Sequence, residues 1–356
     1  MRKELRHKMM RLMSFNTIRQ ISPLGGWGTL FLLLLFACTP SSDIEEEEAF
    51  YMQTMATLVD EAAEKKMTRA HWNNAGKFLW DNSNGKMVVF VKKSADGEFI
   101  LWGTNKYSFA KVAKMDNEDA TYASITSNSG ILKTDIRKIT VGQTPVYFFS
   151  PVAKADVSSE GVVNFTLPGV FEQPASHSLV DFADYTYIMA ESTVSEVSNV
   201  TILATPTQFT GIPAVIRFSV SNDRYTNITV KSIKITPNNG FHQSLSFTPG
   251  NPTSTPSESK HTDVKANIEN GAGEVLGIRN TENATKDYFV FIFPTSFTTA
   301  TLTLEGVDSE DRDFTYTCDI SDKTFEGNHI YTWNIKVADN FMSLSFNENE
   351  TGIFQW

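Results

Sequence analysis

Cysteine is scarce in this sequence, since only Cys38 and Cys318 occur among its 356 residues. A disulfide framework is therefore excluded as the source of stability, and the fold must depend on the burial of apolar surface. Positive charge is also in short supply, because 31 basic residues accompany 41 acidic ones and the net charge is −10. A chain this acidic offers no obvious phosphate-binding surface, which argues against nucleic acid as a partner.

Motifs of catalysis and metal binding are missing as well. The sequence contains no H-E-x-x-H, no G-x-S-x-G and no glycine-rich phosphate loop, and no two histidines after residue 38 have metal-ligand spacing. Asp308, Asp311 and Asp313 carry oxygen ligands suited to Ca²⁺, but their spacing fits no EF-hand loop and favours a solvated hairpin tip. We therefore expect no enzyme, no metal and no cofactor.

No apolar run is long enough to span a bilayer, which needs about 20 residues. The apolar residues 30–36 follow six basic residues and are followed by Ala37 and Cys38. A basic start, a short apolar core and a small residue before the cut are typical of a secretory signal. With Cys38 next, the segment resembles the lipobox of a bacterial lipoprotein; the alternative is a plain signal peptide with a chance cysteine.

The lipobox predicts that residues 1–37 are a signal peptide and that Cys38 is acylated. Removal of the signal peptide takes away six basic residues and one acidic residue, which brings the net charge from −10 to −15. After a polar tether come four glutamates at residues 45–48. Met52, Met55 and Val59 then recur at helical spacing, and Lys65 and Lys66 suit the end of a helix. We expect a helix over residues 44–66, so that residues 38–66 form a tether and a helical stalk. The acidic run also resembles the surface-export signal of Bacteroidota lipoproteins.

From residue 67 onward the pattern becomes that of short strands. Apolar and polar residues alternate in runs such as 87–91, 214–220 and 228–235, and turn signals such as Asp96-Gly97 separate several of them. Many short strands separated by turn-forming residues indicate an all-β fold made of β-sandwiches. Residues 192–199 lack Gly and Pro and read as a linker. We expect one β-sandwich over residues 67–195 and a second over residues 196–356.

Several segments together resemble the fimbrillin, or Mfa-like, family of Bacteroidales, which comprises surface lipoproteins and pilin subunits. The matching positions, in chain order, are Met67-Thr68-Arg69-Ala70, Trp80 with residues 87–90, residues 165–168 with Gln173, Asp184 and residues 187–190, Phe209 with residues 214–218, and residues 325–331. The resemblance covers most of the chain after the signal peptide.

The resemblance implies two tandem transthyretin-like β-sandwich domains and a route of assembly. In that route an arginine-specific protease removes the first strand of the N-terminal domain, and an extended segment of another subunit fills the groove by strand addition. Arg69 matches the cleavage position, with Ala70 as the new N-terminus. The alternative is that Arg69 is an ordinary exposed residue and the lipid stays attached. Because the stalk reads as a helix, its removal need not open a groove.

The C-terminal segment is the candidate donor strand. Apolar and polar residues alternate over residues 342–346, and a second apolar group follows. The candidate donor residues are Met342, Leu344, Phe346, Ile353, Phe354 and Trp356. The alternative is that this segment is the last strand of the second domain, followed by a packed tail.

Together these features predict a surface-exposed, lipid-anchored protein of the outer membrane. Its expected role is that of a pilus structural or accessory subunit in assembly and adhesion, with other pilus subunits as partners. The alternative is a monomeric glycan-binding lipoprotein that uses an exposed aromatic such as Trp72. A glycosidase is the least favoured reading, because no reactive constellation is present.

Overall fold

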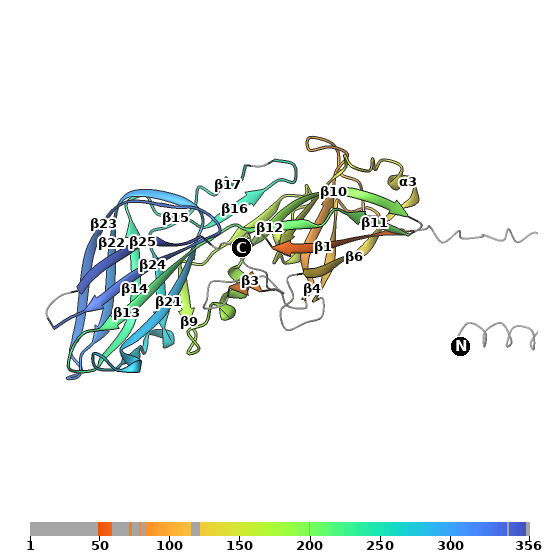
Figure 1. The fold of residues 1–356 in the computed structure, drawn as a ribbon. Coiled ribbons are helices and arrows are strands. Elements are labelled where there is room, and N and C mark those ends of the chain that lie inside the picture. Colours follow the sequence, from red (N-terminus) through yellow and green to blue (C-terminus); the bar gives the residue numbers. More distant parts are fainter. Residues whose placement is uncertain are drawn as a thin grey trace, which may run out of the picture. The chain divides into compact units, whose positions relative to one another are not determined.

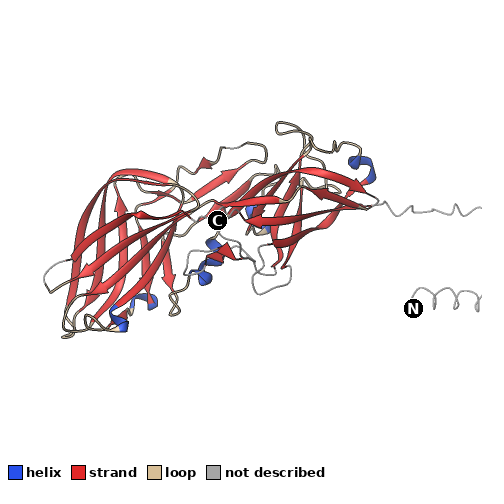
Figure 2. Cartoon of the chain, in the orientation of Figure 1, coloured by secondary structure: helices blue, strands red, loops and turns tan. Residues whose placement is uncertain are grey.

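The computed structural model describes residues 49–58, 71–72, 78–79, 83–114, 122–198, 200–251, 253–339 and 342–353. Strands make up most of these residues and helices are few and short (Figure 2), which confirms the predicted all-β class. The short helical turns among them are α3 (Lys133–Ile136), η1 (Lys154–Asp156), η2 (Leu179–Tyr185), η3 (Glu269–Gly271) and η4 (Glu282–Ala284). Within the described part of the chain, no helix has the length and apolar character needed to cross a bilayer.

The first sheet has eight strands in the order β11-β1-β12-β10-β7-β4-β5-β6, and a further pairing of β6 with β1 closes it. Its strands are β1 (Ala49–Leu58), β4 (Ser83–Val91), β5 (Tyr107–Lys114), β6 (Tyr122–Leu132), β7 (Pro145–Ser150), β10 (Ile188–Ser198), β11 (Thr201–Ala204) and β12 (Thr207–Gly211). Strand β1 is antiparallel to β6 and parallel to both β11 and β12 (Figure 1). A separate short pair is formed by β2 (His71–Trp72) and β3 (Phe78–Leu79).

The predicted N-terminal helix is wrong over residues 49–58, because these residues of the expected stalk form strand β1. Their side chains alternate, buried at Phe50, Met52, Thr54 and Ala56 and exposed at Tyr51, Gln53 and Met55. The same sequence fits both periods, since Met52 and Met55 have helical spacing while Phe50, Met52 and Ala56 share one face of a strand. Strands β6, β11 and β12 supply hydrogen-bonding partners for the backbone on both edges of this segment. This tertiary pairing favours the strand over the helix.

The predicted linker is also corrected, because residues 192–198 belong to β10, which pairs with β7, β11 and β12. The first sheet continues to Gly211, beyond the boundary expected near residue 195. The division into two transthyretin-like domains stays a prediction.

Two further sheets are built mainly from strands of the second half of the chain. One has the order β21-β13-β24-β25, and the other has the order β23-β22-β14-β19-β9, with β20 paired to β14. Their strands are β9 (Val170–Gln173), β13 (Ala214–Asn222), β14 (Ile228–Pro237), β19 (Val264–Ile268), β20 (Glu274–Leu276), β21 (Thr285–Ile292), β22 (Thr295–Val307), β23 (Asp313–Phe325), β24 (His329–Val337) and β25 (Met342–Ile353). Trp333 of β24 packs on Phe325 of β23, with ring centroids 6.2 Å apart, so side chains of both sheets share one core.

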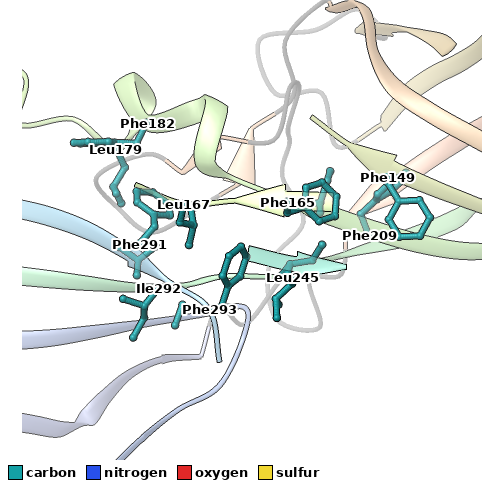
Figure 3. Packing of buried hydrophobic residues seen from close by; sticks show 14 of the residues in the cluster. Phe149, Phe165, Leu167, Leu179, Phe182, Phe209, Leu245, Phe291, Ile292 and Phe293 are labelled. Atoms are coloured by element: carbon teal, nitrogen blue, oxygen red, sulfur yellow. The ribbon is translucent and has the colours of Figure 1, made fainter. Parts of the chain in front are cut away.

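The two halves of the chain interlock through a pair of short strands. Strand β8 (Val163–Thr166) pairs with β16 (Ser244–Phe247), which also pairs with β17 (Thr255–Pro256), and β9 runs parallel to β19. A small pair, β15 (Phe241–His242) and β18 (Lys260–His261), lies nearby in the sequence. Phe165 of β8 is opposite Leu245 of β16 and packs on Phe149 of the first sheet, as Figure 3 shows. A continuous aromatic core therefore joins the first sheet to the strands of the second half.

Three tyrosines in this core predict an alkaline limit to stability. Burial, reinforced by Glu191, raises the pKa of Tyr147 to about 12. Burial also raises the pKa of Tyr187 and the pKa of Tyr288, the latter with help from Glu274. In the unfolded chain these phenols ionise near pH 10, whereas the folded chain keeps them protonated. Stability is therefore retained below pH 10 and falls as the pH rises toward the folded-state pKa values.

We expect urea midpoints to drop steadily between pH 9.5 and 11.5, with about 1.4 kcal/mol per pH unit for each such tyrosine. Tyr288→Phe removes one ionising group and should make the alkaline slope shallower. Urea titrations of both proteins across this pH range test the expectation, and an unchanged slope in the variant would contradict it.

Candidate strand-exchange site

The site of interest is the place that β1 occupies in the first sheet. Along its first part β1 pairs with β11, with Met52 opposite Ile202, and farther on it pairs with β12, with Ala56 opposite Thr207. Its other edge follows β6 from Ala49, opposite Leu132, to Thr57, opposite Tyr122. A single strand thus closes the sheet between two edges that have no other strand between them.

Polar side chains fix the register of β1 where its pairing is irregular. The register with β6 shifts between Tyr51 and Gln53, and there the Met52 amide donates to Ser127 Oγ at 2.9 Å. Thr54 lies where the neighbour changes from β11 to β12, and its hydroxyl donates to the carbonyls of Ala204 and Thr205, both at 3.1 Å. These hydrogen bonds satisfy buried backbone groups that the strand ladder leaves out.

A glycine on β6 lets β1 approach closely. A Cβ placed on Gly130 would lie 2.6 Å from the Ala49 Cβ, so any larger residue there would push β1 away. Inside the sheet, Met52 is fully buried and belongs to one apolar cluster with Ile125, Ile131 and Ile202. If β1 left, it would uncover this apolar surface together with the free backbone groups of β6, β11 and β12.

The predicted cleavage and lipidation positions, Arg69, Ala70 and Cys38, lie outside the described residues. In sequence, however, Arg69 comes after β1 and before β2, the next described strand. A cut after Arg69 would therefore separate β1 covalently from every later strand. The sequence signal for this arrangement was the period-2 alternation from Phe50 to Ala56, which the helical spacing of the methionines obscured.

The candidate donor segment forms β25, at one edge of the sheet ordered β21-β13-β24-β25. Leu344 lies opposite Ile335 and Met342 opposite Val337, and both side chains are half-buried against the core. The backbone of Phe346 pairs with Trp333 and that of Ile353 with His329. Phe354 and Trp356 lie outside the described residues. In this chain the segment serves as the last strand, and its use as a donor stays a prediction.

The other residues singled out in the sequence have ordinary structural surroundings. Asp308 accepts hydrogen bonds from the amides of Glu310 and Arg312 at 2.9 and 3.1 Å and forms an ion pair with Arg312, as expected of a hairpin tip. No group of three or more metal-ligating side chains is found in the described ranges. Cys318 is half-buried on β23, and burial raises the pKa of its thiol. The Trp72 backbone belongs to β2.

No model of a known protein family matches the chain, and no curated protein matches it. Among solved structures, a "putative cell adhesion protein" from Bacteroides uniformis is 11% identical, with a TM-score of 0.49 over 86% of this chain and 98% of that one. The tip fimbrial protein Mfa3 from Porphyromonas gingivalis is 11% identical, with a TM-score of 0.40 over 84% and 98%. A fimbrial assembly protein from Parabacteroides distasonis is 12% identical, with a TM-score of 0.37 over 84% and 99%.

These similar structures include fimbrial proteins of Bacteroidales, the group to which the sequence motifs pointed. Each of these TM-scores lies below 0.5.

Proposed function

We propose that this chain is a surface-exposed lipoprotein of the outer membrane that serves as a structural or accessory subunit of a fimbria and joins other subunits by strand addition. The observation that carries the proposal is the position of β1. It is the first described strand, it closes the first sheet between β6 and the β11–β12 pair, and its apolar side chains alternate inward. A strand in that position can be replaced by another extended segment of similar pattern.

The driving force for exchange follows from what the groove would expose. Removal of β1 leaves backbone donors and acceptors unpaired along two edges, and each buried one costs about 1–3 kcal/mol if it stays unsatisfied. It also uncovers apolar side chains such as Ile125, Ile131 and Ile202, whose reburial is favourable. An incoming strand restores both contributions, with backbone hydrogen bonds for affinity and alternate side chains for register.

Cleavage after Arg69 is the proposed trigger, and acylation of Cys38 is the proposed anchor. Both positions precede β2, so the same cut would break the covalent links of the folded part to the lipid and to its own β1. An arginine-specific protease and the neighbouring subunits are therefore the proposed partners. The alternating β25, which contains Met342 and Leu344, is the proposed donor to the next subunit.

Proteolysis tests the trigger. We expect an arginine-specific protease to give one early product that begins at Ala70, to move it from the membrane fraction to the supernatant, and to yield ladders in mildly denaturing gels. Arg69→Ala should block all three effects. Arg137→Ala is the matched control, because Arg137 is exposed at the end of α3 and should not change them. Trimmed protein that stays monomeric at high concentration would contradict strand addition.

A further inference from the structure

An exposed aromatic ring lies in the loops at one end of the sheets of the second half. It is the most exposed of the large hydrophobic side chains in the part of the chain that the structure describes. Tyr225, between β13 and β14, is 69% exposed, and Ile278, between β20 and β21, is 42% exposed. The Arg279 guanidinium lies 3.7 Å from the centroid of the Tyr225 ring and donates a hydrogen bond to the Tyr225 hydroxyl. We call Tyr225, Ile278 and Arg279 the loop platform.

The platform is held in place by buried hydrogen bonds. The Asn222 side chain, 2% exposed, donates to the carbonyls of Thr226 and Gly277, both at 2.8 Å, and accepts from the Arg224 amide at 3.0 Å. The Arg279 amide donates to the Arg224 carbonyl at 2.9 Å. Both loops are therefore fixed to one another, so the exposed ring is pre-organised.

Two arginines of these loops, Arg224 and Arg279, have no carboxylate partner among the described residues. Arg224 is 7% exposed, yet its guanidinium bonds only the Ala338 carbonyl and the Tyr316 hydroxyl and lies over the rings of Phe314 and Tyr316. Across the described ranges, neither Arg224 nor Arg279 forms an ion pair, although Arg217 and Arg312 both pair with aspartates. The nearby Asp223 is paired with Lys336 at 3.3 Å.

Both guanidiniums lack a carboxylate partner among the described residues, although the chain has 41 acidic residues. Guanidinium is the side-chain group best suited to bidentate hydrogen bonding with oxyanions such as carboxylate and sulfate. Because Tyr225 is 69% exposed while Arg279 covers one side of its ring, the other side stays open to a ligand. An apolar ring face beside a cation matches a sugar ring that carries an anionic group.

We propose that the loop platform binds an acidic saccharide, with the sugar ring on Tyr225 and its carboxylate or sulfate on Arg279. Arg224, next to Tyr225 in the same loop, adds a second positive charge. This would give the protein an adhesive function that is independent of strand addition, because the platform is complete in a single uncleaved chain. The net charge of −10 repels polyanions from the rest of the surface, so retention of a polyanion requires a local site.

Binding is tested on the intact single chain with polygalacturonate as the carboxylate probe, heparin as the sulfate probe and dextran as the neutral probe. We expect one acidic polymer to bind and dextran not to bind. Tyr225→Ala and Arg279→Ala should each weaken binding at least tenfold, whereas Tyr225→Phe should retain most of it. Arg137→Ala, which removes an exposed arginine at the end of α3, beside the strands of the first sheet, is the control.

The stability of each variant is checked by thermal unfolding, since both side chains are partly exposed and their loss should leave the fold intact. Failure of both acidic polymers to bind would overturn the proposal, as would binding that survives Tyr225→Ala. Equal binding of poly-glutamate would overturn it in favour of an acidic peptide. None of these outcomes depends on protease cleavage or polymerisation, so the proposed fimbrial function is judged separately.

Discussion

A chain that carries Met52→Asp is expected to release β1 from the first sheet and to self-associate without any protease. Met52 is fully buried, and an unpaired carboxylate at this position costs several kcal/mol. The strands β10, β7, β4, β5 and β6 pair with one another independently of β1, so the rest of the sheet can persist. The groove would then be open in an uncut chain, where strands of other copies can add to it.

Light scattering over a range of concentrations measures this association, and hydrogen exchange reports whether the amides of residues 49–58 lose protection. Gln53→Asp is the matched control, because Gln53 lies on the exposed face of the same strand and should leave a protected monomer. Met52→Ala should have a smaller effect than Met52→Asp and should lower the free energy of unfolding by about 2–5 kcal/mol. A folded, monomeric Met52→Asp chain with protected β1 amides would argue against β1 as the exchangeable strand.

Replacement of Gln173 by Leu is expected to destabilise the chain by roughly 2–6 kcal/mol. Gln173 is 7% exposed, and its amide nitrogen donates to the carbonyls of Phe171 and Phe289, both at 2.9 Å. Its amide oxygen accepts from the Phe289 amide at 2.8 Å. Leucine has a similar size but leaves the Phe289 backbone groups buried without partners, and each costs about 1–3 kcal/mol.

These bonds connect β9 to β21, strands of two different sheets, so the loss should appear as lower cooperativity between the halves of the chain as well as a lower urea midpoint. Glu172→Leu serves as the comparison, because Glu172 is exposed and bonds the Asn267 side chain at the surface. Its effect should stay within about 0.5 kcal/mol. Similar losses for both variants would mean that the buried amide bridge is not what holds β9 to β21.

Most individual strands could be predicted from local alternation. The runs 87–91, 214–220 and 228–235 lie within β4, β13 and β14. At the Asp96-Gly97 turn signal the chain reverses: the Gly97 amide bonds the Ser94 carbonyl at 2.9 Å, and the amides of Lys93 and Ile100 bond the carbonyls of Glu98 and Val91 at 3.0 and 2.8 Å, around a short bridge between Lys92 and Phe99. Turn chemistry thus predicted the reversal of the chain but not the extent of pairing around it.

The site was harder to predict than the strands. In β1 the methionines fit a helical period while the whole segment also fits a strand, and no local signal could choose between them. The exposure of Tyr225 had no sequence signal either, because Tyr is common both in sheet cores and at surfaces. Trp72 has polar sequence neighbours and fits a surface aromatic on local grounds, whereas the loop platform depends on contacts between loops more than fifty residues apart.

The sequence by itself determined the all-β class, the positions of most strands and the absence of metal and nucleophile motifs, because these depend on residue types and on a two-residue period along the chain. Only the tertiary structure decided that β1 closes the first sheet, that β8 and β9 pair with strands of the second half, and that Arg224 is buried without a carboxylate. The physical reason is that a strand needs hydrogen-bonding partners from elsewhere in the chain, and which partners it finds depends on long-range packing that local alternation does not encode.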